Sequence, residues 1–192
     1  MIDDNGWLNI KSNKVFSQKT YSPFFNKRPI NTKINLIVVH CISLPEGSYA
    51  LSDNCGIDRL FTNKLDPVLD KSYYFDLKEL KVSAHIVIFR NGDIKQYVSF
   101  FDRAWHAGES SFKGVENCND YSIGIELEGS VKDKTGYTKN QYKSLKELII
   151  ILKDYFLINN STKECVTTHK FIAPSRKEDP GDYFDFSCLE LD

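Results

Sequence analysis

Two of the four histidines in this sequence close short apolar runs, where a side chain can leave a hydrophobic core and face a cleft. His40 ends the run Leu-Ile-Val-Val-His, and His169 ends Val-Thr-Thr-His. Asp179 follows ten residues after His169. Two imidazoles and one carboxylate suit a zinc ion, and three protein ligands leave the fourth tetrahedral position open, as in catalytic sites. On spacing alone, strand-end histidines more often have only a structural role.

An acidic strand offers a candidate proton acceptor. Residues 122–128 (SIGIELE) alternate apolar residues with small or acidic ones. Because successive side chains of a strand point to opposite faces, Gly124, Glu126 and Glu128 share the face opposite the isoleucines. Glu126 can therefore point into a cleft. The plainer interpretation is an acid that faces solvent, and Glu128 is the better candidate for that position.

Several other segments have the pattern of strands. The β-branched run that ends at His40 is nearly continuous, which is typical of a buried strand. An Asn-Gly pair between two apolar segments is a strong hairpin signal. On these patterns we expect strands at 35–40, 84–90, 94–100, 122–128 and 165–169, with the hairpin turn at Asn91 and Gly92.

Helical spacing is clearest in residues 142–156, and Thr138 and Gln141 ahead of it have the pattern of a capping box. A shorter helix is expected at 57–65, after a loop that contains Pro45, Gly47, Ser48 and Ser52. The chain from 173 onward is loop-like. Strands and helices alternate, and the hairpin requires one antiparallel pair. We therefore expect an α/β fold in which residues 1–192 form a single domain around a mixed sheet.

Composition limits the classes of partner. The chain has 192 residues, of which 41% are hydrophobic and 27% charged, and its formal net charge is −1. This is ordinary for a globular protein large enough to have its own core. Such a charge attracts neither nucleic acid nor an anionic membrane in bulk. No motif indicates an obligate protein partner, so we expect the main partner to be a substrate.

The cysteines and the N-terminal residues indicate the cellular compartment of the protein. Five cysteines are scattered without any Cys-x-x-Cys pair, so we expect a reducing environment and no disulfide framework. The first residues contain acids and no apolar run, unlike a secretory signal. No segment approaches the ~18 apolar residues that span a bilayer. We therefore expect a cytoplasmic protein.

Five sequence blocks resemble the N-acetylmuramoyl-L-alanine amidase family, in particular its cytosolic AmpD-type branch, the 1,6-anhydro-N-acetylmuramoyl-L-alanine amidases. The resemblance extends from about Gly6 to Phe186, in the same order and with similar spacing. It implies a mixed sheet flanked by helices, as in peptidoglycan-recognition proteins. The blocks are VVHCISLPEG (38–47), KVSAHIVIFRNGDIKQYV (81–98), RAWHAGES (103–110), CNDYSIGIELEG (118–129) and THKFIAPSRKEDPG (168–181).

The resemblance assigns roles to five residues. It implies that His40, His169 and Asp179 hold one zinc ion. It also implies that Glu126 takes a proton from water at the metal, and that Lys177 stabilises the oxyanion. The implied reaction is hydrolysis of the amide between (anhydro)muramic acid and L-alanine in soluble muropeptides, during peptidoglycan recycling in the cytoplasm.

Substrate contacts are less defined. Arg176 can pair with a peptide carboxylate, and Trp105 can pack on a sugar ring or, equally, in the core. The family usually has Asn where this chain has Cys41, and usually Arg where it has Lys81. It often has Arg where this chain has Asn117. In the relatives those positions contact the sugar or a peptide carboxylate, so the changes affect substrate preference and leave the metal set complete.

Two of the histidines have no implied ligand role. We interpret His85, at the start of a strand, as structural, and we expect His106 at most to line the cleft.

Two other functions stay open. Some peptidoglycan-recognition proteins lack a zinc ligand and only bind, but here all three ligands and both Glu126 and Lys177 are present. A secreted or phage-derived amidase acting on polymeric cell wall is the third hypothesis. It is disfavoured because the sequence shows neither a signal segment nor a wall-binding domain.

Overall fold

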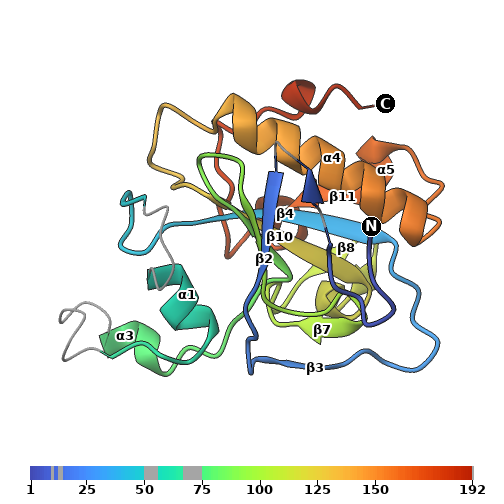
Figure 1. Ribbon diagram of the computed structural model, residues 1–192, viewed down its shortest axis with the longest axis horizontal. Coiled ribbons are helices and arrows are strands. Elements are labelled where there is room, and N and C mark those ends of the chain that lie inside the picture. Colours follow the sequence, from blue (N-terminus) through green and yellow to red (C-terminus); the bar gives the residue numbers. More distant parts are fainter. Residues whose placement is uncertain (10, 13–14, 50–55, 67–74, 192) are drawn as a thin grey trace.

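A seven-stranded sheet runs through the centre of the computed structural model (Figure 1), which describes residues 1–9, 11–12, 15–49, 56–66 and 75–191. Strands β5, β10, β4 and β11 pair in parallel, whereas β6 is antiparallel to β5, and β1 to β2. The sheet is therefore mixed, as predicted. In spatial order its strands are β1 (Lys11–Ser12), β2 (Val15–Lys19), β6 (Ile94–Gln96), β5 (Ile86–Ile88), β10 (Ser122–Glu128), β4 (Leu36–Ile42) and β11 (Val166–Thr168).

Shorter elements surround this sheet. Two small antiparallel pairs join β3 (Phe25–Lys27) to β7 (Asp102–Ala104) and β8 (Ser111–Phe112) to β9 (Val115–Glu116). The helices are α1 (Gly56–Phe61), α3 (Phe75–Lys78), α4 (Lys139–Tyr155), α5 (Thr162–Cys165) and α6 (His169–Ile172), with 3-10 turns η2 (Cys118–Asp120) and η3 (Phe186–Leu189). Within the described ranges, no helix has both the length and the apolar character needed to cross a bilayer.

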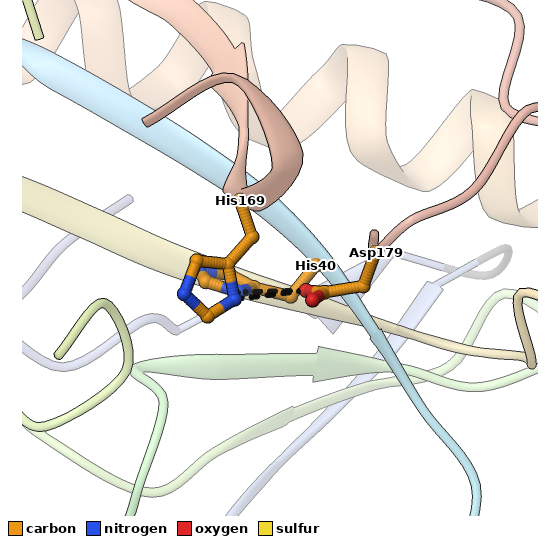
Figure 2. Close-up of side chains that lie close together, drawn as sticks. All are labelled: His40, His169 and Asp179. Atoms are coloured by element: carbon orange, nitrogen blue, oxygen red, sulfur yellow. Dashed lines mark hydrogen bonds and ion pairs between the residues drawn. The ribbon is translucent and has the colours of Figure 1, made fainter. Parts of the chain in front are cut away.

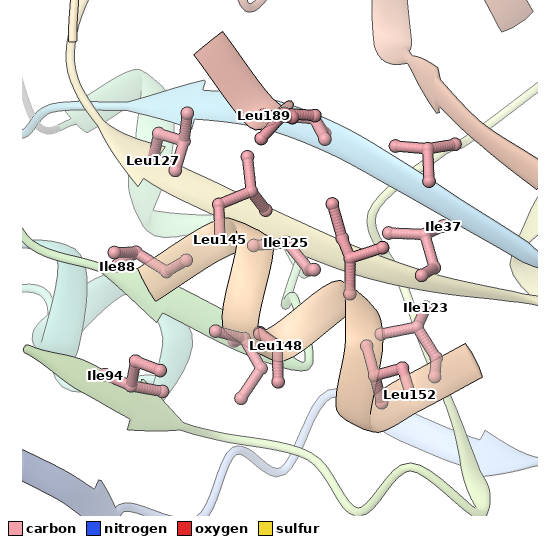
Figure 3. Close-up of a cluster of buried hydrophobic side chains, with 14 of the residues drawn as sticks. Ile37, Ile88, Ile94, Ile123, Ile125, Leu127, Leu145, Leu148, Leu152 and Leu189 are labelled. Atoms are coloured by element: carbon pink, nitrogen blue, oxygen red, sulfur yellow. The ribbon is translucent and has the colours of Figure 1, made fainter. Parts of the chain in front are cut away.

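Helix α4 packs on one face of the sheet and closes the main core (Figure 3). Its buried leucines face the isoleucines of β10 and β4. Each such side chain contributes about 1.5–3 kcal/mol when it is removed from water. Because strand residues alternate, the other face of β4 and β10 carries His40 and Glu126. The core residues of this interface are Ile37, Val39, Ile123, Ile125, Leu127, Leu145, Leu148, Ile149 and Leu152.

The start of α4 is as predicted. The Thr138 hydroxyl accepts a hydrogen bond from the backbone N–H of Gln141 at 3.1 Å, and the Gln141 side chain accepts one from the Thr138 N–H at 3.1 Å. The Gln141 amide also donates to the carbonyl oxygens of Ile88 and Glu128. The cap therefore anchors the helix to the ends of β5 and β10.

Several boundaries differ from prediction. The strands expected at 84–90 and 94–100 are shorter, Ile86–Ile88 and Ile94–Gln96, although the predicted hairpin joins them. The helix expected at 57–65 ends at Phe61. The predicted loop is confirmed for residues 43–49, and Ser52 lies outside the described residues. Strand β2 was not predicted, since it has no long apolar run; it pairs with β6 in parallel.

The expectation that Glu128 faces solvent was wrong. Glu128 is only 1% exposed. The Glu128 carboxylate accepts a hydrogen bond from the backbone N–H of Arg90 at 3.0 Å. This contact ties the end of β10 to the residues that follow β5 and keeps the acid inside the protein.

Candidate metal centre and catalytic site

The structure brings His40, His169 and Asp179 together (Figure 2). The two Nδ1 atoms of the histidines are 2.9 Å apart. Asp179 Oδ2 lies 3.2 Å from Nδ1 of His40 and 3.0 Å from Nδ1 of His169. Both histidines are buried, and the Asp179 side chain is 16% exposed. Three potential ligand atoms from distant parts of the chain thus converge on one point.

Strand register explains why the two histidines meet. Thr168, the last residue of β11, pairs with Val39 of the parallel strand β4. The residue that follows each of these two is a histidine, so both histidines lie at the same end of the sheet. His169 is the first residue of α6 and does not end the strand as predicted, because Thr168 caps that helix by accepting from the N–H of Phe171 at 3.3 Å.

Backbone contacts hold Asp179 in place. Its carbonyl oxygen accepts a hydrogen bond from the N–H of Lys170 at 2.9 Å, which ties the loop back to α6. The following peptide bond, to Pro180, is cis, and the Pro180 carbonyl accepts from the Tyr137 hydroxyl at 2.6 Å. These two hydrogen bonds hold the backbone of the loop at Asp179 and Pro180.

The donor set fits a tetrahedral metal ion. With bonds of about 2.1 Å, neighbouring ligands of such an ion stand about 3.4 Å apart, so the observed 2.9–3.2 Å needs only a small expansion. The Nε2 atom of His169 lies 3.2 Å from the Ala107 carbonyl oxygen. Since a carbonyl can only accept, Nε2 carries the hydrogen and Nδ1 presents its lone pair to the site.

Protonation states also suit a cation. Burial lowers the pKa of His40 to about 4, although the Asp179 carboxylate beside it opposes this shift. Burial alone would raise the pKa of Asp179, but its close contacts with the His169 and His40 rings outweigh that and hold the pKa well below its usual range. At neutral pH His40 is therefore neutral and Asp179 ionised, which are the forms that bind metals.

Glu126 and Lys177 stand beside this group. Glu126 pairs in register with His40. Its Oε2 is shielded from solvent and has no hydrogen-bond partner among the described residues. Burial, followed by the charge of Asp179, raises the pKa of Glu126 well above its ordinary value, and the charge of Lys177 opposes this shift. A buried carboxylate oxygen without a partner is costly for folding and is typical of groups that handle protons.

An open cavity of about 620 Å³ leads to the site. Asp179 and Lys177 belong to its wall. Glu46, also in the wall, joins the loop after β4 to the loop after β10, with its carboxylate 2.9 Å from Nζ of Lys132. Sequence reasoning did not identify Glu46. The wall comprises Cys41, Ile42, Ser43, Glu46, Gly129, Ser130, Val131 and residues 174–179.

Two of the predicted substrate residues line this cavity. Burial raises the pKa of Cys41 to about 12, so its thiol stays neutral. Nη2 of Arg176 donates to the carbonyl oxygens of Ala107 and Glu109 at 2.7 and 2.8 Å. This guanidinium therefore braces the segment that also holds His169.

The other three predicted substrate residues are not in the cavity wall. The Trp105 indole donates to Asn26 Oδ1 at 2.7 Å and stacks on Phe24. Lys81 and Asn117 are exposed, and Asn117 adopts the left-handed conformation ahead of η2. A substrate role for these three stays a prediction.

The remaining histidines differ from each other. His85 is structural, as predicted: its Nδ1 accepts the Gly124 N–H at 3.0 Å, so Nε2 carries the hydrogen and donates to the Asp102 carbonyl at 3.1 Å. His106 Nδ1 lies 2.9 Å from Nε2 of His40. This second contact was missed, because nothing in the segment around His106 indicates which side chain it faces.

Comparisons with known proteins agree with this geometry. Residues 30–182 match the family described as N-acetylmuramoyl-L-alanine amidase. The 1,6-anhydro-N-acetylmuramyl-L-alanine amidase AmpD of Haemophilus influenzae is 48% identical over 166 residues, which cover 86% of this chain and 85% of the relative.

Two solved structures extend the comparison. The crystal structure of a selenomethionine derivative of AmpD has a TM-score of 0.84 at 41% identity, covering 99% of this chain and 98% of that one. The complex of the Escherichia coli amidase AmiD with anhydro-N-acetylmuramic acid-L-Ala-D-gamma-Glu-L-Lys has a TM-score of 0.55 at 28% identity, covering 85% of this chain and 60% of that one.

Proposed function

The chain belongs to the N-acetylmuramoyl-L-alanine amidase family, and on this premise we propose that it is a zinc-dependent 1,6-anhydro-N-acetylmuramoyl-L-alanine amidase. It hydrolyses the amide between (1,6-anhydro-)N-acetylmuramic acid and L-alanine in soluble muropeptides. The observation that carries the proposal is the convergence of His40, His169 and Asp179 beside the unpartnered carboxylate oxygen of Glu126. The activity named for the relative that is 48% identical supports it.

His40, His169 and Asp179 hold the zinc ion in this proposal. Nitrogen and oxygen donors in a set of three are typical of catalytic zinc, which retains an open position. When bound, zinc polarises a carbonyl and lowers the pKa of water towards about 7.

Glu126 moves the proton. Its Oε2 has no partner to displace and lies on the same sheet face as the His40 imidazole. A carboxylate whose pKa is raised by burial is a better base near neutral pH than an exposed one. Oε2 accepts the proton of the attacking water and then delivers it to the nitrogen of the departing L-alanine.

Lys177 supplies positive charge from the cavity wall. It is placed by the turn in which its N–H donates to the Ala173 carbonyl at 3.0 Å. Its ammonium group stabilises the negative charge that develops on the scissile carbonyl oxygen. Because the same turn carries Asp179, the charge is held in position before the substrate arrives.

A role in cytoplasmic peptidoglycan recycling is part of the proposal. The four cysteines within the described residues are free thiols, which suits a reducing compartment. Cell fractionation with antibody detection tests the location. Recovery of the protein outside the cytoplasm would contradict it.

Turnover on defined substrates tests the function. The protein loaded with zinc should release L-Ala peptides from soluble anhydromuropeptide, and mass spectrometry should find the cut at the lactyl–alanine amide. Fully loaded protein without turnover would favour a binding module. Faster cleavage of intact sacculi than of soluble anhydromuropeptide would favour a wall-degrading amidase.

A further inference from the structure

We propose that His106 is a positioning residue that sets the tautomer of the metal ligand His40. It accepts a hydrogen bond from Nε2 of His40, so that the Nδ1 lone pair of His40 faces Asp179 and His169. The inference rests on the proposed metal site. His106 does not belong to the group that can hold the ion, so its effect passes through His40.

A chain of hydrogen bonds gives the direction of every proton. It starts at the Cys118 carbonyl oxygen, which can only accept and lies 2.5 Å from Oγ of Ser122. The Ser122 hydroxyl donates its hydrogen to that carbonyl oxygen. The hydroxyl oxygen must therefore accept from Nε2 of His106, which lies 3.2 Å away. A neutral imidazole protonated at Nε2 has a lone pair on Nδ1.

The last link reaches the ligand. Nδ1 of His106 lies 2.9 Å from Nε2 of His40 and can only accept there. Nε2 of His40 therefore carries the hydrogen, and its Nδ1 is left with a lone pair. Partners of this kind orient metal-binding histidines and raise their basicity.

The fold provides a specific place for this ring. A Cβ atom at Gly124 would stand 2.4 Å from Cγ of His106, so the ring occupies the space that a larger residue on β10 would fill. The side chain of Asn119 holds the backbone here, accepting from the N–H groups of His106 and Ala107 at 3.1 and 2.8 Å. His106 crosses His40 almost at a right angle, with an interplanar angle of 84°.

Two variants of similar size separate hydrogen bonding from packing. His106→Asn keeps an acceptor oxygen near the position of Nδ1, and His106→Leu does not. We expect His106→Leu to weaken zinc binding 10- to 100-fold, the usual effect of removing such a partner, and His106→Asn to restore most of it. Competition titration with a chromophoric chelator measures the affinity, and His85→Asn controls for the loss of a buried histidine beside the same strand.

A second measurement needs no variant. Imidazole ¹⁵N shifts of the metal-free wild-type protein should show His40 protonated at Nε2. Protonation of His40 at Nδ1, or zinc affinity of folded His106→Leu within twofold of wild type, would overturn the proposal. Failure of the wild-type protein to bind zinc would count against the proposed function, while the ¹⁵N shifts would still decide the role of His106.

Discussion

Glu126 and His40 are direct register partners on the parallel strands β10 and β4. Partners of this kind point to the same face from strands about 4.8 Å apart. The proposed proton acceptor and a proposed metal ligand are thus set side by side by backbone pairing and do not depend on a flexible loop. Because one of these residues is proposed to bind the metal and the other to accept the proton, substitutions can test metal binding and proton transfer separately.

Glu126→Gln should keep the metal and lose turnover. The amide has nearly the same shape but cannot accept the proton, so kcat should fall about 10²- to 10⁴-fold. Steady-state kinetics together with metal analysis by mass spectrometry check this. A kcat within a few-fold of wild type would exclude Glu126 as the base. Glu128→Gln, on the same strand face, is the matched control for kcat.

Asp179→Ala should lose the metal. It removes one of three converging donors and leaves His40 and His169 without the carboxylate that both contact. In the wild type, free zinc at 100 times Kd should stabilise the fold by about 2.7 kcal/mol. Thermal unfolding with and without zinc measures this gain. An equal gain in Asp179→Ala would show that the ion binds elsewhere.

Lys177→Met should lower kcat about 10²- to 10³-fold by removing the charge that faces the oxyanion. Zinc affinity should stay within a few-fold of wild type, since Lys177 does not belong to the ligand group. Lys177→Arg, which retains the charge, should recover part of kcat. A pure increase in KM for Lys177→Met would instead assign this residue to substrate binding.

Leu148→Ala should destabilise the protein by about 2–5 kcal/mol, because it opens a hole between α4 and the sheet. Ile150 is on the same helix and 49% exposed, so Ile150→Ala should cost far less. Urea unfolding of the metal-free protein measures both. Similar losses would mean that α4 does not close the core as the structure shows.

Strong local patterns accounted for a large part of the fold. The helical repeat and the capping box at Thr138 predicted α4 correctly, because both signals lie within one turn or a few turns of chain. The alternation in 122–128 and the apolar run before His40 likewise predicted β10 and β4. Weak or short elements such as β2 form because a neighbouring strand pairs with them, and that information is not local.

The candidate site, like the fold, was only partly predictable from the sequence. The residue types and the resemblance were enough to select His40, His169, Asp179, Glu126 and Lys177 as a set. They could not tell which acid of β10 is buried in a structural role, and Glu128 was assigned wrongly. Nor could they tell that Trp105 bonds to Asn26 and lies outside the cavity wall.

By itself, the sequence determined the chemistry available: two imidazoles, three functional charged groups, and the strands that carry His40 and Glu126. The tertiary structure alone decided how those groups face one another. The pairing of Thr168 with Val39 brings His169 to His40, and the missing side chain of Gly124 leaves room for His106. Contacts between residues far apart in the chain depend on strand register and packing, which no local pattern encodes.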